Sequence, residues 1–169
     1  MPAAKKNTEE PDLLTVNFSG EAYAVLKHLS YRTGKPIEDV VEQAVSVQKW
    51  YRQSVVAKGE HLAVRDGGEV RDVTVDFNEV AQKSPVQSLS SVENCVTQGL
   101  YSMKISGAAY KDLEELSYHY KAPMQDVLLQ AIGFLRWYHD DVVANGKTLA
   151  VRSKENWLGI SKTHDIKIS

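Results

Sequence analysis

The chain has 169 residues, of which 43% are hydrophobic and 25% charged, and its formal net charge is −2. This composition is ordinary for a globular protein of one compact unit or two small ones. No apolar run approaches the ~18 residues of a membrane span, and no signal-peptide stretch opens the chain, so we expect a cytoplasmic protein without a membrane partner. Its single cysteine, Cys95, allows no internal disulfide.

A repeat organises the sequence. The segment from Ser19 to Arg65 recurs, shifted by 87 positions, from Ser106 to Arg152 without a gap. The longest identical stretches are Leu29-Ser30-Tyr31 over Leu116-Ser117-Tyr118, Val55-Val56-Ala57 over Val142-Val143-Ala144, and Leu62-Ala63-Val64-Arg65 over Leu149-Ala150-Val151-Arg152. Two such copies predict a duplicated module that pairs with itself and so imitates a two-fold symmetric homodimer.

In chain order, residues 1–12 are polar and contain Pro2 and Pro11, which predicts a flexible N-terminal arm. The first strand follows at Leu14–Ser19, where apolar and polar residues alternate, and Tyr101–Ser106 repeats the alternation. Because one short strand is not stable alone, we expect these two to pair with each other as an antiparallel ribbon.

Two helices are predicted after each strand. Ser19 and Ser106 stand at the N-cap of the first, which runs to about Arg32 or about His119. Pro36 and Pro123 suit the first turn of the second, which runs to about Lys58 or about Asn145. Four residues late in these second helices are predicted to pack in the core: Trp50, Tyr51, Trp137 and Tyr138.

A β-hairpin is predicted after each helix pair, with tight-turn residues Asp66-Gly67-Gly68 in the first. The predicted fold class is therefore mainly α with short β elements: four helices, a ribbon shared by the repeats, and one hairpin per repeat. The expected boundaries are a first repeat at 13–77, a linker at 78–99 and a second repeat at 100–169.

Catalysis and metal binding find no support in the sequence. The run His139-Asp140-Asp141 resembles a ligand set, but consecutive helical residues point in different directions. There is no glycine-rich phosphate loop and no recognisable nucleophile arrangement. We therefore expect no enzyme, no cofactor and no metal.

The order strand, short helix, longer helix, duplicated so that two strands pair, resembles the ribbon-helix-helix family of DNA-binding proteins. The resemblance covers about Leu14 to Lys58 and Tyr101 to Asn145. It implies a single-chain pseudo-dimer that inserts its ribbon into the major groove of double-stranded DNA, with a role in transcription regulation, for example as a repressor near the nucleoid.

Carried over position by position, the resemblance implies two groups of site residues. The base-reading residues would be Thr15, Asn17, Ser102 and Lys104. The phosphate-contacting residues, at or beside helix N-termini, would be Ser19, Lys35, Ile37, Ser106, Lys121 and Met124.

A second interpretation remains open. The duplicated fold would then be a non-catalytic scaffold whose hairpins or ribbon bind a partner protein or another copy of the chain, because exposed strand edges are a known route to assembly.

Overall fold

The computed structural model describes residues 13–82, 100–155 and 158–168. The first repeat contains β1 (Leu13–Ser19), α1 (Gly20–Thr33), α2 (Ile37–Tyr51), a π-helical turn η1 (Arg52–Val56), β2 (His61–Asp66), β3 (Glu69–Asp72) and α3 (Phe77–Gln82). The second contains β4 (Leu100–Ser106), α4 (Gly107–Tyr120), α5 (Met124–Trp137), a π-helical turn η3 (Tyr138–Val143), β5 (Thr148–Arg152) and β6 (Thr163–Ile166). The predicted arm at 1–12, Cys95 and most of the linker lie outside the described residues.

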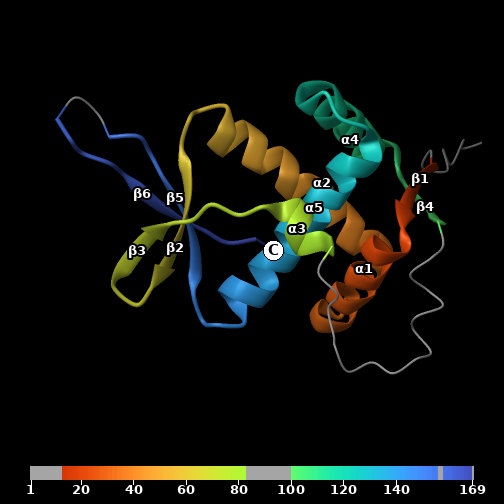
Figure 1. The fold of residues 1–169 in the computed structure, drawn as a ribbon, viewed down its shortest axis with the longest axis horizontal. Coiled ribbons are helices and arrows are strands. Elements are labelled where there is room, and N and C mark those ends of the chain that lie inside the picture. Colours follow the sequence, from red (N-terminus) through yellow and green to blue (C-terminus); the bar gives the residue numbers. More distant parts are fainter. Residues whose placement is uncertain (1–12, 83–99, 156–157, 169) are drawn as a thin grey trace, which may run out of the picture.

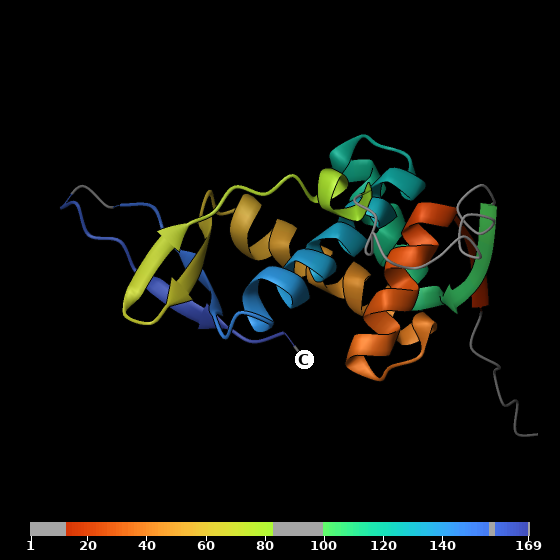
Figure 2. The same cartoon turned by 60° about the horizontal axis from the view of Figure 1, so that its bottom comes forward.

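The fold class predicted from the sequence is wrong. Instead of four helices with a ribbon and two separate hairpins, the described residues form five α-helices and two antiparallel sheets, a mixed α and β architecture. Figures 1 and 2 show the two-stranded sheet of β1 and β4 at one end of the long axis and the four-stranded sheet at the other. The long helices lie between the two sheets.

The two-stranded ribbon joins the repeats. Strands β1 and β4 pair antiparallel over their whole length, with Thr15 opposite Lys104 and Asn17 opposite Ser102. The expected pairing of each strand with its counterpart is therefore present. Val16, Phe18 and Ile105 point inward and are buried, so the period-two pattern separates a core face from an outer face.

The helix caps follow the local sequence. The hydroxyl of Ser19 accepts a hydrogen bond from the Ala22 N–H, and Ser106 does the same for Ala109, both at 3.2 Å. Helix α1 ends at Gly34 in the left-handed region, with φ at 68°. Lys121 adopts the same conformation after α4, with φ at 51°, an unusual backbone for a residue with a side chain.

The α-helical part of the second helix in each repeat is shorter than expected. Helix α2 gives way at Arg52 to the turn η1, and α5 gives way at Tyr138 to η3, so both repeats change hydrogen-bonding pattern at nearly the same place. Trp137 and Tyr138 are buried, and Trp50 and Tyr51 are partly buried against the same apolar cluster. Their predicted packing in the core is confirmed.

The hairpins merge instead of standing apart. Strand β2 pairs with β5, which gives the order β3-β2-β5-β6 and places Ala63 opposite Ala150 at the centre. The sequence pattern predicts a second strand of the first hairpin from Val70 to Phe77, but the observed strand β3 ends at Asp72. The sequence pattern of one hairpin does not reveal that its neighbour is a hairpin 87 residues away.

Helix α3 is the element that the sequence did not predict. Residues 78–82, assigned to the linker, form most of it, and Asp76 caps it by accepting from the Asn78 and Glu79 N–H groups. Phe77 is buried against Phe134, with ring centroids 4.6 Å apart. At six residues α3 gives too short a periodic signal, and its stability comes from packing on α5.

Among the helices of the described residues, none has the length and apolar character that a bilayer crossing requires.

Candidate nucleic-acid interface

The outer face of the ribbon carries the four residues predicted to read bases. In an antiparallel pair, directly opposite residues project from the same side, so the pairs Thr15/Lys104 and Asn17/Ser102 share one face. All four side chains are exposed. The structure therefore brings this predicted group together, with two members from each repeat.

One hydrogen bond organises this face. The Ser102 hydroxyl donates to Oδ1 of Asn17 across the two strands, at 2.6 Å. A carbonyl oxygen has two acceptor positions, so Asn17 keeps one acceptor site and both amide donors for another partner. Lys104 adds the single formal charge among the four residues.

Aromatic rings support the ribbon from its inner side. The Tyr23 ring from α1 stacks on the Tyr101 ring from β4, with centroids 4.2 Å apart and planes 2° apart. Phe18 from β1 lies in the same stack, 6.1 Å from Tyr23. These contacts hold the two strands against the helices and leave the outer face as the exposed surface.

Acidic residues occupy one flank of the ribbon. A groove of about 820 Å³ lies between the ribbon and the start of α2, and Glu38 and Glu42 contribute to its lining. The Glu42 carboxylate accepts a hydrogen bond from the Ser106 N–H at 3.1 Å, which ties α2 to the end of β4. The repeat did not predict this role of Glu42, because the equivalent residue of the second repeat is Leu129.

The phosphate-contact residues predicted in the first repeat fall in two places, Ser19 at the end of β1 and Lys35 with Ile37 where α1 meets α2. Ser19 caps α1 and is exposed, whereas Lys35 and Ile37 lie half-buried at the corner between α1 and α2. The Lys35 carbonyl accepts from the Ser30 hydroxyl at 2.6 Å, which fixes the corner. Glu38 and Asp39 occupy the first turn of α2, where their charge opposes an incoming anion.

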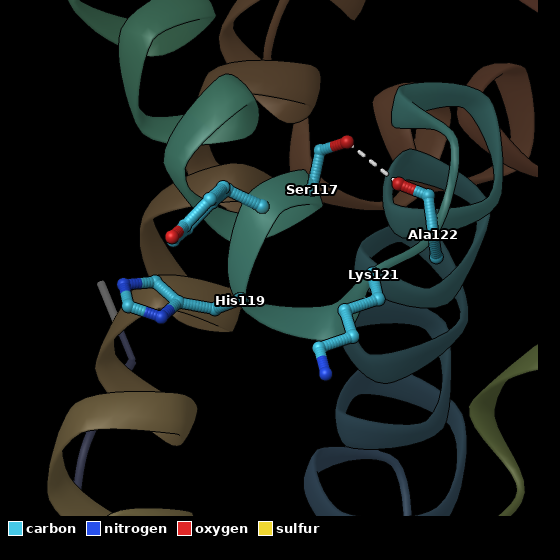
Figure 3. A pocket seen from close by; sticks show the side chains of 5 residues that line it. Ser117, His119, Lys121 and Ala122 are labelled. Atoms are coloured by element: carbon cyan, nitrogen blue, oxygen red, sulfur yellow. Dashed lines mark hydrogen bonds between the residues drawn. The ribbon is translucent and has the colours of Figure 1, made fainter.

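The corresponding corner of the second repeat is more favourable to an anion. Lys121 is exposed there, and a shallow hollow is formed by Ser117, Tyr118, His119, Lys121 and Ala122. Figure 3 shows the Ser117 hydroxyl donating to the Ala122 carbonyl, at 2.6 Å, across this corner. Met124 begins α5, whose first turn carries one acidic residue, Asp126, in place of two.

Among the predicted phosphate contacts, Ser106 uses both its hydroxyl and its backbone N–H in hydrogen bonds within the chain. Its hydroxyl caps α4 and its N–H donates to Glu42. The structure thus places Ser19 and Ser106 at the ends of the ribbon strands and the other four predicted phosphate contacts at the two helix corners. The α4–α5 corner has one acidic residue in the following turn, against two at the α1–α2 corner.

We compared the chain with protein-family models, curated proteins and solved structures, and none of the three comparisons gave a match.

Proposed function

We propose that this protein binds double-stranded DNA with some sequence preference by inserting the β1–β4 ribbon into the major groove, in the manner of ribbon-helix-helix proteins, as a transcriptional repressor or related regulator. The observation that supports this most is the ribbon's outer face, where Thr15, Asn17, Ser102 and Lys104 are all exposed at one end of the molecule. The B-DNA major groove is about 12 Å wide and admits a two-stranded ribbon.

Each outward side chain has a distinct role in this proposal. The carboxamide of Asn17 suits adenine, which offers one donor and one acceptor, and the ammonium of Lys104 suits the two acceptors of guanine. Thr15 and Ser102 accept or donate and are permissive. Because the repeats present different pairs, the preferred site differs between its two halves.

The helix corners supply phosphate contacts, and we assign the larger share to the α4–α5 corner. Lys121 is exposed there, and the positive end of the α5 dipole faces outward with one acidic residue in the first turn. The few cations at the ribbon and this corner imply a modest salt dependence, since each neutralised phosphate contributes about −0.9 to the slope of log K against log salt.

The test is selection of bound sequences from a pool of random duplexes at low and moderate salt. Wild-type protein is compared with an Asn17→Ala/Lys104→Ala variant and with a matched Asn78→Ala/Lys162→Ala variant. The control removes the same residue types from exposed positions outside the ribbon. We expect enrichment of one motif by the wild type and the control, and loss of that enrichment in the ribbon variant.

Failure of the wild type to bind any duplex at low salt would contradict the proposal, because non-specific phosphate contacts are strongest there. Binding that the ribbon variant retains with the same motif would contradict the assignment of the ribbon as the reading element.

Where the scaffold alternative uses the hairpins, it depends on the free edges of the four-stranded sheet, and those edges are poorly suited to strand addition. Strands β3 and β6 have four residues each and carry exposed charged side chains, with Glu69 and Arg71 paired to each other at 2.6 Å on β3. Short, charged edges are the usual means of preventing further strand pairing. The ribbon's outer face is therefore the stronger candidate.

A further inference from the structure

The site that α3 occupies on α5 has an equivalent on α2. On α5, the first turn of α3 rests on Gly133, and Phe77 lies against the rings of Phe134 and Trp137, with centroids 4.6 Å and 6.1 Å apart. The repeat relates four residues of this face to four residues of α2: Gln130 to Gln43, Gly133 to Ser46, Phe134 to Val47 and Trp137 to Trp50.

These four residues of α2 line a groove of about 330 Å³, together with Ile166, Lys167 and Ile168 of the segment that ends β6. We call it the α2 groove. It is the counterpart, in the duplicated core, of an interface that the chain already uses between α3 and α5 (Figure 1).

The difference in exposure between the two faces shows the effect of α3. Trp137 is 6% exposed and Gly133 is buried, whereas Trp50 is half-buried and Ser46 is exposed. The tryptophans are the same residue on equivalent helices, so the additional exposure of Trp50 marks a face that lacks the cover of a short helix.

The segment after β6 reaches the α2 groove without filling it. Ile166 lies opposite Leu149, and Val73 donates its N–H to the equivalent residue, Leu62. Residues 166–168 therefore correspond to residues 73–75, and α3 begins two residues after that stretch. Among the described residues of the second repeat, none stands in the place of α3.

The contacts of α3 indicate the side chains that such a groove accepts. Phe77 is followed three and four residues later by Val80 and Ala81, and all three face the core. In the α2 groove, Val47 is smaller than its counterpart Phe134 and leaves space for an aromatic ring. Ser46 carries a side chain where the α5 face has glycine, so an entering helix lies slightly farther from α2.

The charge of the α2 groove favours an acidic occupant. Lys167 lines it, is exposed, and takes part in no ion pair within the ranges that the structure describes. No acidic side chain is among the residues of the lining. Helix α3 carries Glu79 in its first turn, where a carboxylate also favours the helix dipole.

We propose that the α2 groove binds a short amphipathic helix of a partner protein. This helix has an aromatic residue and a carboxylate in its first turn, and small apolar residues three and four positions after the aromatic one. The outward residues of the ribbon do not line the groove. The inference goes beyond DNA binding and needs no DNA, so the two can fail separately.

The experiment is an NMR titration of the isotope-labelled full chain with a peptide of the α3 sequence, residues 76–82. A chemical staple that leaves Phe77, Glu79, Val80 and Ala81 unchanged holds the peptide helical, because so short a helix does not form alone. Binding is followed at the indole N–H of Trp50, which the variant Trp50→Phe identifies.

Matched variants separate the α2 groove from the rest of the surface. Ser46→Arg places a large side chain in the groove, and Ser161→Arg places the same side chain at an exposed position outside it. A peptide with Phe77→Ala tests the aromatic contact on the unaltered protein, so this arm does not depend on the folding of a variant.

We expect a saturable shift of the Trp50 signal with a Kd of about 1 mM or tighter. Ser46→Arg and the Phe77→Ala peptide weaken binding on the order of tenfold, and Ser161→Arg leaves it unchanged. Lys167→Glu weakens binding of the acidic peptide and strengthens binding of a Glu79→Lys peptide, because the charges are then exchanged.

A Trp50 signal that does not respond to the peptide would overturn the proposal. Binding that Ser46→Arg leaves unchanged would overturn it as well, because the peptide would then be replacing α3 on α5. An equal response of the two peptides to Lys167→Glu would rule out the acidic partner.

Discussion

A Cβ atom on Gly133 would lie 1.8 Å from the carbonyl oxygen of Phe77. The first residue of α3 thus rests directly on the backbone of α5, and only glycine permits that approach. Arg136 secures the same contact by donating to the Val80 carbonyl at 2.9 Å. The equivalent position in the first repeat is Ser46, which is exposed on α2, so α3 breaks the symmetry of the duplicated core.

Replacing this glycine tests the contact. Gly133→Ala gains roughly 1 kcal/mol in helix propensity, but the added methyl group must displace α3, and overpacking of this kind costs about 1–3 kcal/mol. We expect a net loss of up to about 2 kcal/mol in the free energy of unfolding, measured by urea denaturation. The matched change Ser46→Ala stays within about 0.5 kcal/mol of the wild type. A Gly133→Ala protein more stable than the wild type would show that α3 does not rest on α5.

His139 predicts a pH dependence of stability. Burial lowers its pKa below the ordinary value of 6.5, Arg32 and Lys35 act in the same direction, and Asp140 opposes them. Its Nε2 is buried without a hydrogen-bond partner in the residues that the structure describes. Because the unfolded chain takes up the proton more readily, this contribution to stability is complete above pH 6.5 and is lost as the pH falls below it.

The measurement compares urea unfolding at about pH 7 and about pH 5. We expect His139→Gln to lose less stability between these values than the wild type, since glutamine does not titrate. His164→Gln, on the exposed β6 strand, retains the wild-type dependence. Equal losses in the wild type and His139→Gln would count against the burial effect.

The unequal strands of the ribbon lead to a prediction about symmetry. Thr15 and Asn17 correspond by the repeat to Ser102 and Lys104, so the double substitution S102T/K104N gives both strands the same outward pair. If the ribbon reads the major groove, we expect the selected DNA site to change from unequal halves to a palindrome, because a two-fold symmetric reader recognises a two-fold symmetric site. Selection from random duplexes checks this, and an unchanged motif would rule out base reading by the ribbon.

Much of the local structure could be predicted from the sequence. The alternation in each strand predicted its inner and outer faces, and Ser19 and Ser106 marked the helix starts. These features depend on neighbours within a few residues, and the repeat supplied a second copy of each signal. The pairing of β1 with β4 also followed, because each strand lacked any other partner of its kind.

The predicted base-reading residues lie together for the same reason. Once β1 and β4 pair antiparallel, alternation alone places Thr15, Asn17, Ser102 and Lys104 on one face. The surroundings of the predicted phosphate-contacting residues could not be predicted in this way, because they depend on long-range contacts. One example is the hydrogen bond between Glu42 and Ser106, which are 64 residues apart.

By itself, the sequence determined the duplication, the two strands that pair, and the helices with their caps, because periodicity and capping act over one or two turns. Only the tertiary structure decided that the hairpins join through β2 and β5, that α3 forms on Gly133, and that helices α1 and α4 lie on opposite sides of α2 and α5. These features arise where segments distant in the chain bury apolar surface against each other, and no local pattern records which segments those are.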